Sequence, residues 1–600
     1  MNLKKIPIIL FPFFCLAMGL GHSYGQVPLR SQSEVDGYAD IPQETIFVHF
    51  NASFLFAGEY LYYKVYCMDK NTKNLSDISK IGYVELVGED GTKVFAQKIR
   101  LENGEGEGDF FIPVSVPSGN YKLVAYTSWM ENGNGENYFR NDLSILNPYQ
   151  GNQAAVLEDP RSKDSIANDS IGNPLETETH PQKSVNNLLA LDVNGEKFGK
   201  RSKVSLSLTS VKDTMAYGTY SLSVRRIDAV AAPKKANTHN FESLYGNPVT
   251  TEPEQGTTVF LPELRGELIT GKVVQKESGE PVANLNVALS IPGTEYVLKI
   301  ANTDNNGTYY FNLNEHYSGT HAILQVLGDD REKYRLLPSE NPPKWDFSKL
   351  KFNSFHITRD MKEMIQERSI YNQIENGYFG VKPDTIKSVP GTAPFNLENA
   401  EVYDLDEYVR FPTIRETTLE FISNVYTKKT KNGEEVFQVR EADTYLESVF
   451  LPLVVVDGFL VQDQLNIINY NARKIKTIRI LRDKYIFGQQ IYKGIIAMES
   501  IDGDYSLNLY GDYAKNIELF KPLPKKNYFH QIYSQENKSE MAHIPDFRYQ
   551  LLWDPEVKLS KEERSLEFYT SDIPGTYRIE LEGFTNKGMP VSKRAQIEVE

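Results

Sequence analysis

The sequence contains little cysteine and little histidine. It holds two cysteines and nine scattered histidines. One cysteine, Cys15, lies in an N-terminal apolar stretch, so Cys67 is the only one left for the folded chain. A single cysteine excludes an intramolecular disulfide and a cysteine zinc site. Cys67 stands in a strand-like run, and we expect it to be a small buried hydrophobic residue.

Motifs that carry chemistry are also missing. The sequence has no His-Glu-x-x-His, no Gly-x-Ser-x-Gly and no phosphate-binding loop. The nearest metal-like pattern joins His239 and Glu242, with His356 as a distant third ligand. Because His239 stands in a polar stretch where no strand would hold ligands, we interpret this pattern as chance. We therefore expect no catalytic residue, no metal and no cofactor, and predict that the protein is not an enzyme.

Long apolar runs are absent after the first 25 residues, where none approaches the roughly 18 residues of a membrane helix. We therefore expect no transmembrane helix. The formal net charge of -15 argues against nucleic acid or an anionic membrane surface as a partner. What the chain does have is tyrosine, 36 in all, which favours a mainly β, exported architecture.

Residues 1–25 are typical of a cleavable signal peptide. Two lysines precede the apolar stretch Ile6–Leu20, and small residues at Ser23–Gly25 precede an expected cleavage ahead of Gln26. A lipoprotein signal at Cys15 is the alternative, but a proline and two phenylalanines stand where small residues are needed. We expect an exported protein of the cell envelope, in the periplasm or associated with the outer membrane.

One phrase, Gly-x-Tyr-x followed by an aliphatic or aromatic residue, recurs along the chain. Glycine adopts turn conformations that other residues resist, and the tyrosine and the residue two positions later fall on one strand face. Each copy therefore predicts the turn into a core strand, and a fifth copy begins at Gly503. The other four copies are Gly119–Leu123, Gly218–Leu222, Gly307–Phe311 and Gly575–Ile579.

Residues 43–149 are the first expected β-sandwich. The phrases Gly58–Tyr66 and Pro117–Thr127 resemble the second macroglobulin domain (MG2) of the bacterial α2-macroglobulin family. Residues 150–187 are polar and without periodicity, so we expect a disordered linker. Further macroglobulin-like sandwiches are expected at 188–232 and, at the end of the chain, at 540–600, with another linker at 233–265.

Residues 266–335 carry a third pattern. Gly271–Val273, the turn Ser278–Pro281 and the run Thr303–Phe311 together resemble the carboxypeptidase regulatory-like domain, a small prealbumin-like β-sandwich. Asp304 could be a calcium ligand, but the Asp-Asn-Asn-Gly sequence favours a turn.

A helix is expected next, at 358–376. Asp360 can cap this helix, with Glu363 three positions on, and apolar residues keep helical spacing after it. We expect the helix to contact the neck before the next domain.

Residues 401–505 give the most specific signal. Val456–Gly458, Ile475–Asp483, Tyr485–Gly488 and Gly494–Ile496 occur in the order found in the plug domain of TonB-dependent outer-membrane receptors, which this stretch resembles. A plug fills a barrel of about 22 strands, each of about 10 residues. The 100 residues after position 500 suffice for about seven. We therefore expect a small α/β interaction module without its barrel.

If the plug-like stretch holds a partner surface, we expect it at Asp457 and Gly458 in its turn and at Arg479 and Arg482 in its basic run. The alternative is that these are ordinary turn and solvated residues. The fold class expected for the whole chain is mainly β, with tandem sandwiches and one α/β domain.

The resulting hypothesis is a non-catalytic exported scaffold or adaptor of the Gram-negative cell envelope. It would bind an outer-membrane β-barrel protein or envelope complex, as an accessory subunit in transport, secretion or barrel assembly. The alternative is a macroglobulin-type endopeptidase inhibitor or protease-binding protein, with 150–187 as its bait stretch. A third hypothesis, an envelope enzyme, requires histidines and carboxylates to converge in a pocket.

Overall fold

The computed structural model shows a mainly β chain, as expected, with one small α/β domain. No helix among the residues described is long and apolar enough to cross a membrane. The expected signal peptide lies outside the described residues. Those residues are 26–28, 31–133, 137–157, 175–177, 188–228, 230–245, 256, 258–293, 296–339, 347–353, 355–389, 394–395, 397–430, 433–440, 450–503, 505, 511–534, 541 and 543–600.

The first sandwich occupies the expected region. One sheet has the order β2-β4-β7 and the other β3-β9-β8-β5-β6, and their facing side chains form one buried core that includes Cys67. The strands are β2 (Glu44–Phe50), β3 (Phe54–Phe56), β4 (Tyr60–Asp69), β5 (Ile81–Gly88), β6 (Lys93–Arg100), β7 (Glu105–Phe111), β8 (Gly119–Tyr126) and β9 (Phe139–Leu146).

The two macroglobulin-like sandwiches expected at 188–232 and 540–600 are one domain, the split sandwich, which corrects the sequence interpretation. Its sheets have the orders β11-β13-β34 and β12-β36-β35-β14-β33, so β14 pairs on both sides with strands from the end of the chain. Neither segment alone has enough strands to form the two facing sheets of a sandwich. The strands are β11 (Leu189–Val193), β12 (Lys197–Phe198), β13 (Lys203–Ser210), β14 (Gly218–Arg226), β33 (Gln550–Leu559), β34 (Glu563–Tyr569), β35 (Gly575–Thr585) and β36 (Pro590–Val599).

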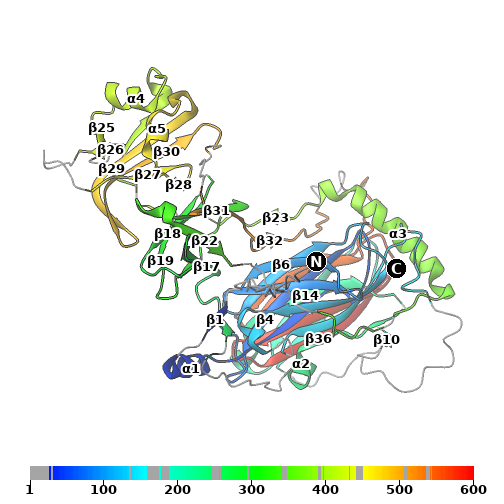
Figure 1. Cartoon of the computed structure of the whole chain (residues 1–600). Helices are drawn as coiled ribbons and strands as arrows, with labels where there is room; N and C mark the ends of the chain where they lie inside the picture. The colour runs from blue at the N-terminus through cyan, green and yellow to red at the C-terminus, as the bar shows by residue number, and fades with distance from the viewer. Residues whose placement is uncertain are drawn as a thin grey trace, which may run out of the picture.

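The described part of 233–265, expected as a linker, is a structured seam between the two sandwiches. Helix α2 (Thr238–Tyr245) places Phe241 against Phe47 of the first sandwich and Phe584 of the split sandwich, with ring centroids 5.5 and 6.2 Å away. Aromatic burial across this seam joins the sandwiches into one body, in which blue and red strands lie side by side in Figure 1.

The third sandwich, called the small sandwich, has sheets β20-β17-β22 and β19-β18-β21-β31. Strand β31 comes from beyond the next domain, so that domain is an insertion rather than a successor. Asp304 forms the expected turn, since its Oδ1 accepts hydrogen bonds from the backbone N–H groups of Asn306 and Thr308 at 2.7 and 2.9 Å. The strands are β17 (Glu267–Gln275), β18 (Asn286–Ile291), β19 (Val297–Asn302), β20 (Thr308–Leu313), β21 (His321–Val326), β22 (Tyr334–Pro338) and β31 (Ala514–Glu518).

The inserted α/β domain has a five-stranded sheet of order β24-β29-β30-β27-β28, in which only β27 and β30 run parallel, and a two-stranded sheet of β25 and β26. The small sandwich and this domain form an arm that projects from the body (Figure 1). Its elements are β24 (Glu401–Asp404), α4 (Ile414–Glu420), β25 (Val425–Lys429), β26 (Glu435–Val439), β27 (Leu453–Val456), β28 (Phe459–Leu460), α5 (Gln464–Ile468), β29 (Ile475–Phe487) and β30 (Gln490–Ser500).

The expected helix exists as α3 (Lys362–Gly377), but it contacts the body rather than the neck of the arm. Met361 takes the N-cap position without a side-chain hydrogen bond, so the expected cap by Asp360 does not form. Arg368 and Asn372 are buried against the first sandwich, because both bond to its Phe54–Glu59 segment. Polar contacts, which helical periodicity does not reveal, therefore direct this helix.

Short elements complete the chain. Most of 150–187 lies outside the described residues, but Val156 is buried and β10 pairs with β15. The short elements are β1 (Gln26–Pro28), α1 (Gln32–Ala39), η1 (Trp129–Gly133), β10 (Leu175–Thr177), η3 (Asp213–Ala216), β15 (Ala231–Pro233), β16 (Thr258–Phe260), η4 (Arg331–Lys333), η5 (Arg359–Met361), η6 (Phe379–Val381), β23 (Thr385–Ile386), η7 (Leu405–Glu407), η8 (Ala472–Lys474) and β32 (Lys526–Asn527).

Candidate partner-binding site

Asp457 occupies the turn between β27 and β28, with a φ of 47°. Its carboxylate accepts hydrogen bonds from the backbone N–H and the hydroxyl of Ser500 at 2.8 and 2.5 Å, and from the N–H of Tyr505 at 3.2 Å. The residue is only 7% exposed. Asp457 therefore ties the turn to the end of β30, and the structure places this residue inside its own domain.

Gly458 faces the small sandwich. Its φ is 88°, and a Cβ atom at this position would lie 2.3 Å from the Cβ of Tyr296. The side-chain amide of Gln325 donates to the carbonyl of Leu460 at 2.8 Å, and that of Gln462 donates to Gln325 Oε1 at 2.9 Å. The turn that we expected to meet a partner thus docks the two domains of the arm on each other.

Arg479 and Arg482 lie on β29, and both are paired within the α/β domain. Arg479 forms an ion pair with Glu499, and Arg482 lies 3.3 Å from Glu401 while donating to the carbonyl of Arg440 at 2.9 Å. Both side chains remain partly exposed. A role in partner binding for these four residues stays a prediction.

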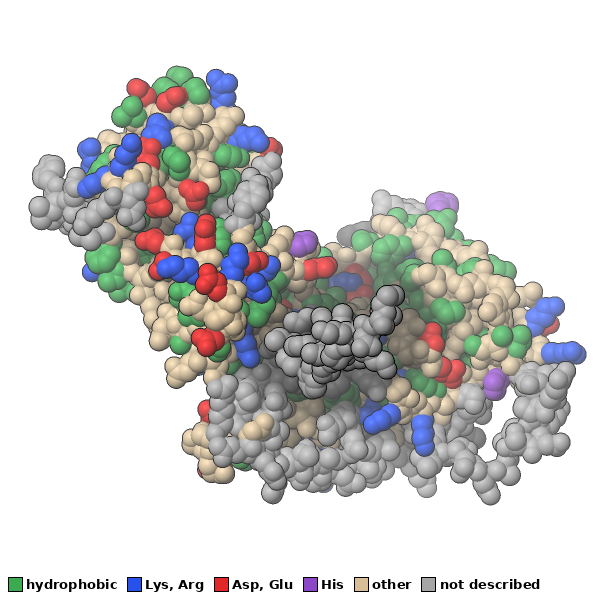
Figure 2. Space-filling view, viewed as in Figure 1, with side chains coloured by type: hydrophobic (Ala, Val, Ile, Leu, Met, Phe, Trp, Pro, Cys, Tyr) green, Lys and Arg blue, Asp and Glu red, His purple; other side chains and the backbone are tan. Residues whose placement is uncertain are grey.

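The far end of the arm exposes apolar side chains. Leu419 of α4 is 80% exposed and Val409 is 79% exposed, the two highest values for large apolar residues among those described. Tyr408, 40% exposed, stacks on Phe421 with centroids 4.4 Å apart. We call these four residues the tip patch. Figure 2 shows hydrophobic side chains among charged ones at this end of the arm.

Sequence reasoning missed the tip patch, because isolated apolar residues in a polar stretch carry no distinctive signal. Within α4 the buried positions are Ile414, Thr417 and Thr418, so Leu419 faces away from the core. An apolar residue on the polar face of a short amphipathic helix is the one signal that could have found it. Exposed apolar patches often mark interaction surfaces.

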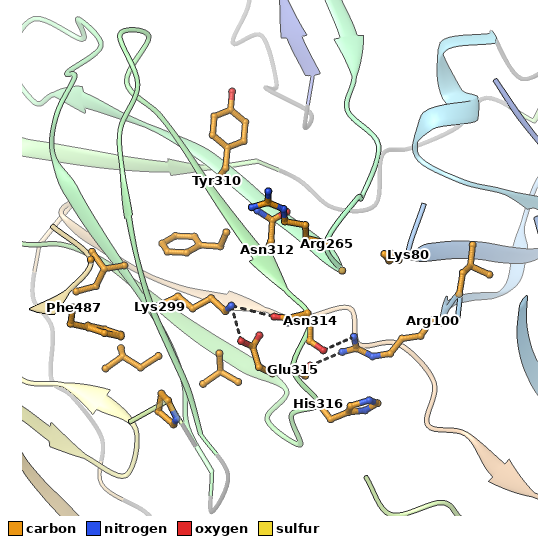
Figure 3. A pocket seen from close by; sticks show the side chains of 18 of the residues that line it. Lys80, Arg100, Arg265, Lys299, Tyr310, Asn312, Asn314, Glu315, His316 and Phe487 are labelled. Atoms are coloured by element: carbon orange, nitrogen blue, oxygen red, sulfur yellow. Dashed lines mark hydrogen bonds and ion pairs between the residues drawn. The ribbon is translucent and has the colours of Figure 1, made fainter. Parts of the chain in front are cut away.

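A cleft of about 940 Å³ opens where the body, the small sandwich and the α/β domain meet. Lys80 and Arg100 line it from the body, Arg265 and Lys299 from the start and third strand of the small sandwich, and Phe487 from the β29–β30 hairpin (Figure 3). The cleft is therefore formed by the way the arm joins the body.

Most of the positive charge in this cleft is neutralised inside the chain. Lys299 pairs with Glu315 at 2.8 Å, and these side chains point toward each other in Figure 3. Arg100 lies 3.6 Å from Glu267 and donates to the carbonyl of Glu315 at 2.7 Å. Arg265 has no ion pair within the described part of the chain. One unpaired arginine in an open cleft is a weaker binding feature than the tip patch.

One arrangement has the geometry of a hydrolase triad. His49 Nδ1 lies 2.6 Å from Ser221 Oγ, and His49 Nε2 lies 3.7 Å from the carboxylate of Glu580. All three are at most 3% exposed. Burial lowers the pKa of His49 to about 4. Since these residues join β2 to β14 and β35 across the body seam, no substrate reaches them, and their role is structural.

The metal-like pattern does not assemble. His239 lies on α2 and is half-buried, whereas His356 is exposed in the segment before α3. No group of three or more histidine, cysteine, aspartate or glutamate side chains suited to a metal ion occurs among the residues that the structure describes.

Comparisons with known proteins give limited similarity. No protein-family model matches the sequence, and no curated protein matches it. Escherichia coli alpha-2-macroglobulin activated by porcine elastase is 9% identical, with a TM-score of 0.23, over 93% of this chain and 44% of that one. Salmonella alpha-2-macroglobulin reacted with methylamine is 10% identical, with a TM-score of 0.22, over 96% of this chain and 40% of that one. The chain spans less than half the length of these structures.

Proposed function

We propose that this protein is a non-catalytic scaffold of the Gram-negative cell envelope that binds a protein partner through the tip patch. The observation that carries the proposal is the placement of Val409 and Leu419, exposed by about four fifths, at the far end of an arm. Burial of such side chains against a partner stabilises a complex by about 25 cal/mol per Å² of apolar area.

The body supports this role because its two sandwiches are packed together as one unit. Its two sandwiches share buried aromatic rings and buried ion pairs, including Lys235 with Glu580. The arm is fixed within itself through Gly458 and Tyr296. A rigid base with a projecting, self-contained domain suits an accessory subunit that docks on an outer-membrane β-barrel protein or another envelope complex.

The test is a crosslinked pull-down of the tagged, full-length protein from intact envelopes, followed by mass spectrometry. It compares the natural chain with Val409→Asp/Leu419→Asp. The control is Ile370→Asp, which places a charge on an apolar residue of α3 in the body that is 55% exposed. We expect a β-barrel protein that is lost with the double variant and kept with the control.

Retention of every partner by the double variant would overturn the proposal. Recovery of proteases instead of a barrel protein would also overturn it, and would favour the macroglobulin-type protease-binding alternative.

A further inference from the structure

A second binding feature lies in the body, where β4, α3 and the C-terminal segments meet. It is a cavity of about 140 Å³, several times the space that one water molecule needs. We call it the aromatic pocket. Eight aromatic residues line it, among them Tyr60, Tyr62, Phe379, Tyr528 and Trp553.

Four of these rings form a row. Tyr62 stacks on Trp553 and Tyr60 on Tyr62, with centroids 5.9 and 5.5 Å apart and planes within 20°. Phe379 continues the row at 6.2 Å from Tyr60. Tyr528 meets Tyr62 edge-on at 5.4 Å. Faces of aromatic rings carry negative potential, so this wall attracts cations.

One acidic group in the wall, Asp384, forms no ion pair among the described residues, although the charges of Lys526 and His530 act on it from nearby. Glu59 pairs with Arg225 at 2.8 Å, and Glu375 pairs with Lys382 at 2.6 Å. Asp384 accepts a hydrogen bond from the N–H of Phe529 at 2.8 Å, but no ion pair reaches it among the described residues. A partly buried carboxylate without a cation is costly, and a bound cation would remove this cost.

We propose that the aromatic pocket binds a lysine or arginine side chain of a polypeptide. The cation lies against the tyrosine faces and pairs with Asp384. The indole N–H of Trp553, in the wall of the pocket, is buried and has no acceptor among the described residues. The inference is independent of the tip patch.

A polypeptide fits better than a free amine because apolar side chains surround the pocket. Phe379 is 46% exposed, and Phe111, 5.1 Å from Tyr60 between ring centroids, is 40% exposed. Hydrophobic residues on either side of a lysine would cover these rings, which a small amine leaves in water.

The test is titration calorimetry of the full-length protein with the peptide acetyl-Leu-Lys-Leu-amide and with its neutral analogue, in which norleucine replaces lysine. We expect binding of the lysine peptide, at least tenfold weaker binding of the analogue, and loss of affinity with added salt. Asp384→Asn keeps an acceptor for the N–H of Phe529, so the local fold is retained. This variant should bind the lysine peptide about tenfold more weakly than the natural chain.

The matched control is Asp329→Asn, an exposed aspartate of the small sandwich, which should bind as the natural chain does. Tyr60→Leu should weaken binding a further several-fold through loss of one ring face. Equal affinity for both peptides, or an unchanged affinity in Asp384→Asn, would overturn the inference. Methylammonium binding as tightly as the lysine peptide would overturn the choice of a polypeptide.

Discussion

The guanidinium of Arg368 donates two hydrogen bonds of 2.8 Å to the carboxylate of Glu59, across 309 positions of sequence. Its third edge donates to Asp228 at 2.8 Å, and the ring centroid of Phe56 lies 4.4 Å from the guanidinium. Both ends of the pair are buried. This contact fixes α3 on the body and links both sandwiches through it.

Removal of Arg368 should therefore destabilise the body strongly. Arg368→Ala leaves Glu59 buried beside Arg225 alone, and we expect a loss of about 3–5 kcal/mol in the free energy of unfolding. Chemical denaturation measures the loss, and hydrogen exchange should show α3 opening first. Arg359→Ala, an exposed arginine just before α3, is the control and should change stability by less than about 0.5 kcal/mol.

The pair of Glu59 and Arg368 also predicts that the stability of the fold depends on pH. Burial alone would raise the pKa of Glu59, but the charges of Arg368 and Arg225 lower it to about 2. A carboxyl with a lowered pKa stabilises the fold above its unfolded pKa near 4.5, and this stability is lost as the pH falls toward 2. Unfolding curves of the natural chain should show this loss, and Arg368→Ala should reduce it. Identical acid dependence in both chains would contradict the assignment.

The raised pKa of Glu131 predicts that the free energy of unfolding changes with pH in the opposite direction. Burial, together with the charges of Glu263 and Glu85, raises its pKa to about 10, and neither carboxyl oxygen has a hydrogen-bond partner among the described residues. The folded chain therefore holds a proton that the unfolded chain releases above about pH 4.5, so stability falls as the pH rises from there toward 10, by up to about 1.4 kcal/mol per pH unit. Glu131→Gln should remove this slope, whereas Glu332→Gln on the surface should keep it.

The Gly-x-Tyr tyrosines divide into two kinds. The hydroxyls of Tyr121, Tyr220 and Tyr577 each donate to the carbonyl four positions earlier, at 2.7, 2.5 and 2.9 Å, as in the tyrosine corner of immunoglobulin-like sandwiches. The buried hydroxyl of Tyr309 has no partner among the described residues. Tyr577→Phe should cost about 1–2 kcal/mol of unfolding free energy, and Tyr309→Phe should be neutral or stabilising. Equal losses would refute the distinction.

A comparison of alanine variants at two glycines distinguishes the cost of a steric clash from the cost of backbone strain. Gly458 has a φ of 88° and faces Tyr296, whereas Gly503 has a φ of 63° and no atom within 4 Å of an added Cβ. Gly503→Ala should cost about 1–2 kcal/mol from the left-handed conformation alone. Gly458→Ala should cost about 1–3 kcal/mol more, and should loosen the arm as measured by small-angle scattering. Equal behaviour of the two variants would show that Tyr296 is not a rigid neighbour.

Local signals in the sequence were reliable where a short stretch determines the backbone. The Gly-x-Tyr phrases at Gly119, Gly218, Gly307 and Gly575 each lie at the start of a strand, in β8, β14, β20 and β35. The turn at Asp457 and Gly458 and the turn at Asp304 were also predictable, because glycine, aspartate and asparagine adopt or stabilise these conformations.

The partners of those elements were not predictable. The expected cap of α3 by Asp360 did not form, and the buried role of Arg368 depends on Glu59, which no local pattern connects to it. The tip patch and the aromatic pocket likewise need distant residues, such as Tyr62 and Trp553, to be placed next to each other.

The sequence by itself thus determined the mainly β character of the chain and the places where many of its strands begin. Only the tertiary structure decided that β14 lies between β33 and β35, and that β31 returns to complete the small sandwich. The physical reason is that the alternation of apolar and polar residues along a strand specifies which of its faces is buried. Backbone hydrogen bonds are the same for every strand, so long-range side-chain contacts decide which strands pair with each other.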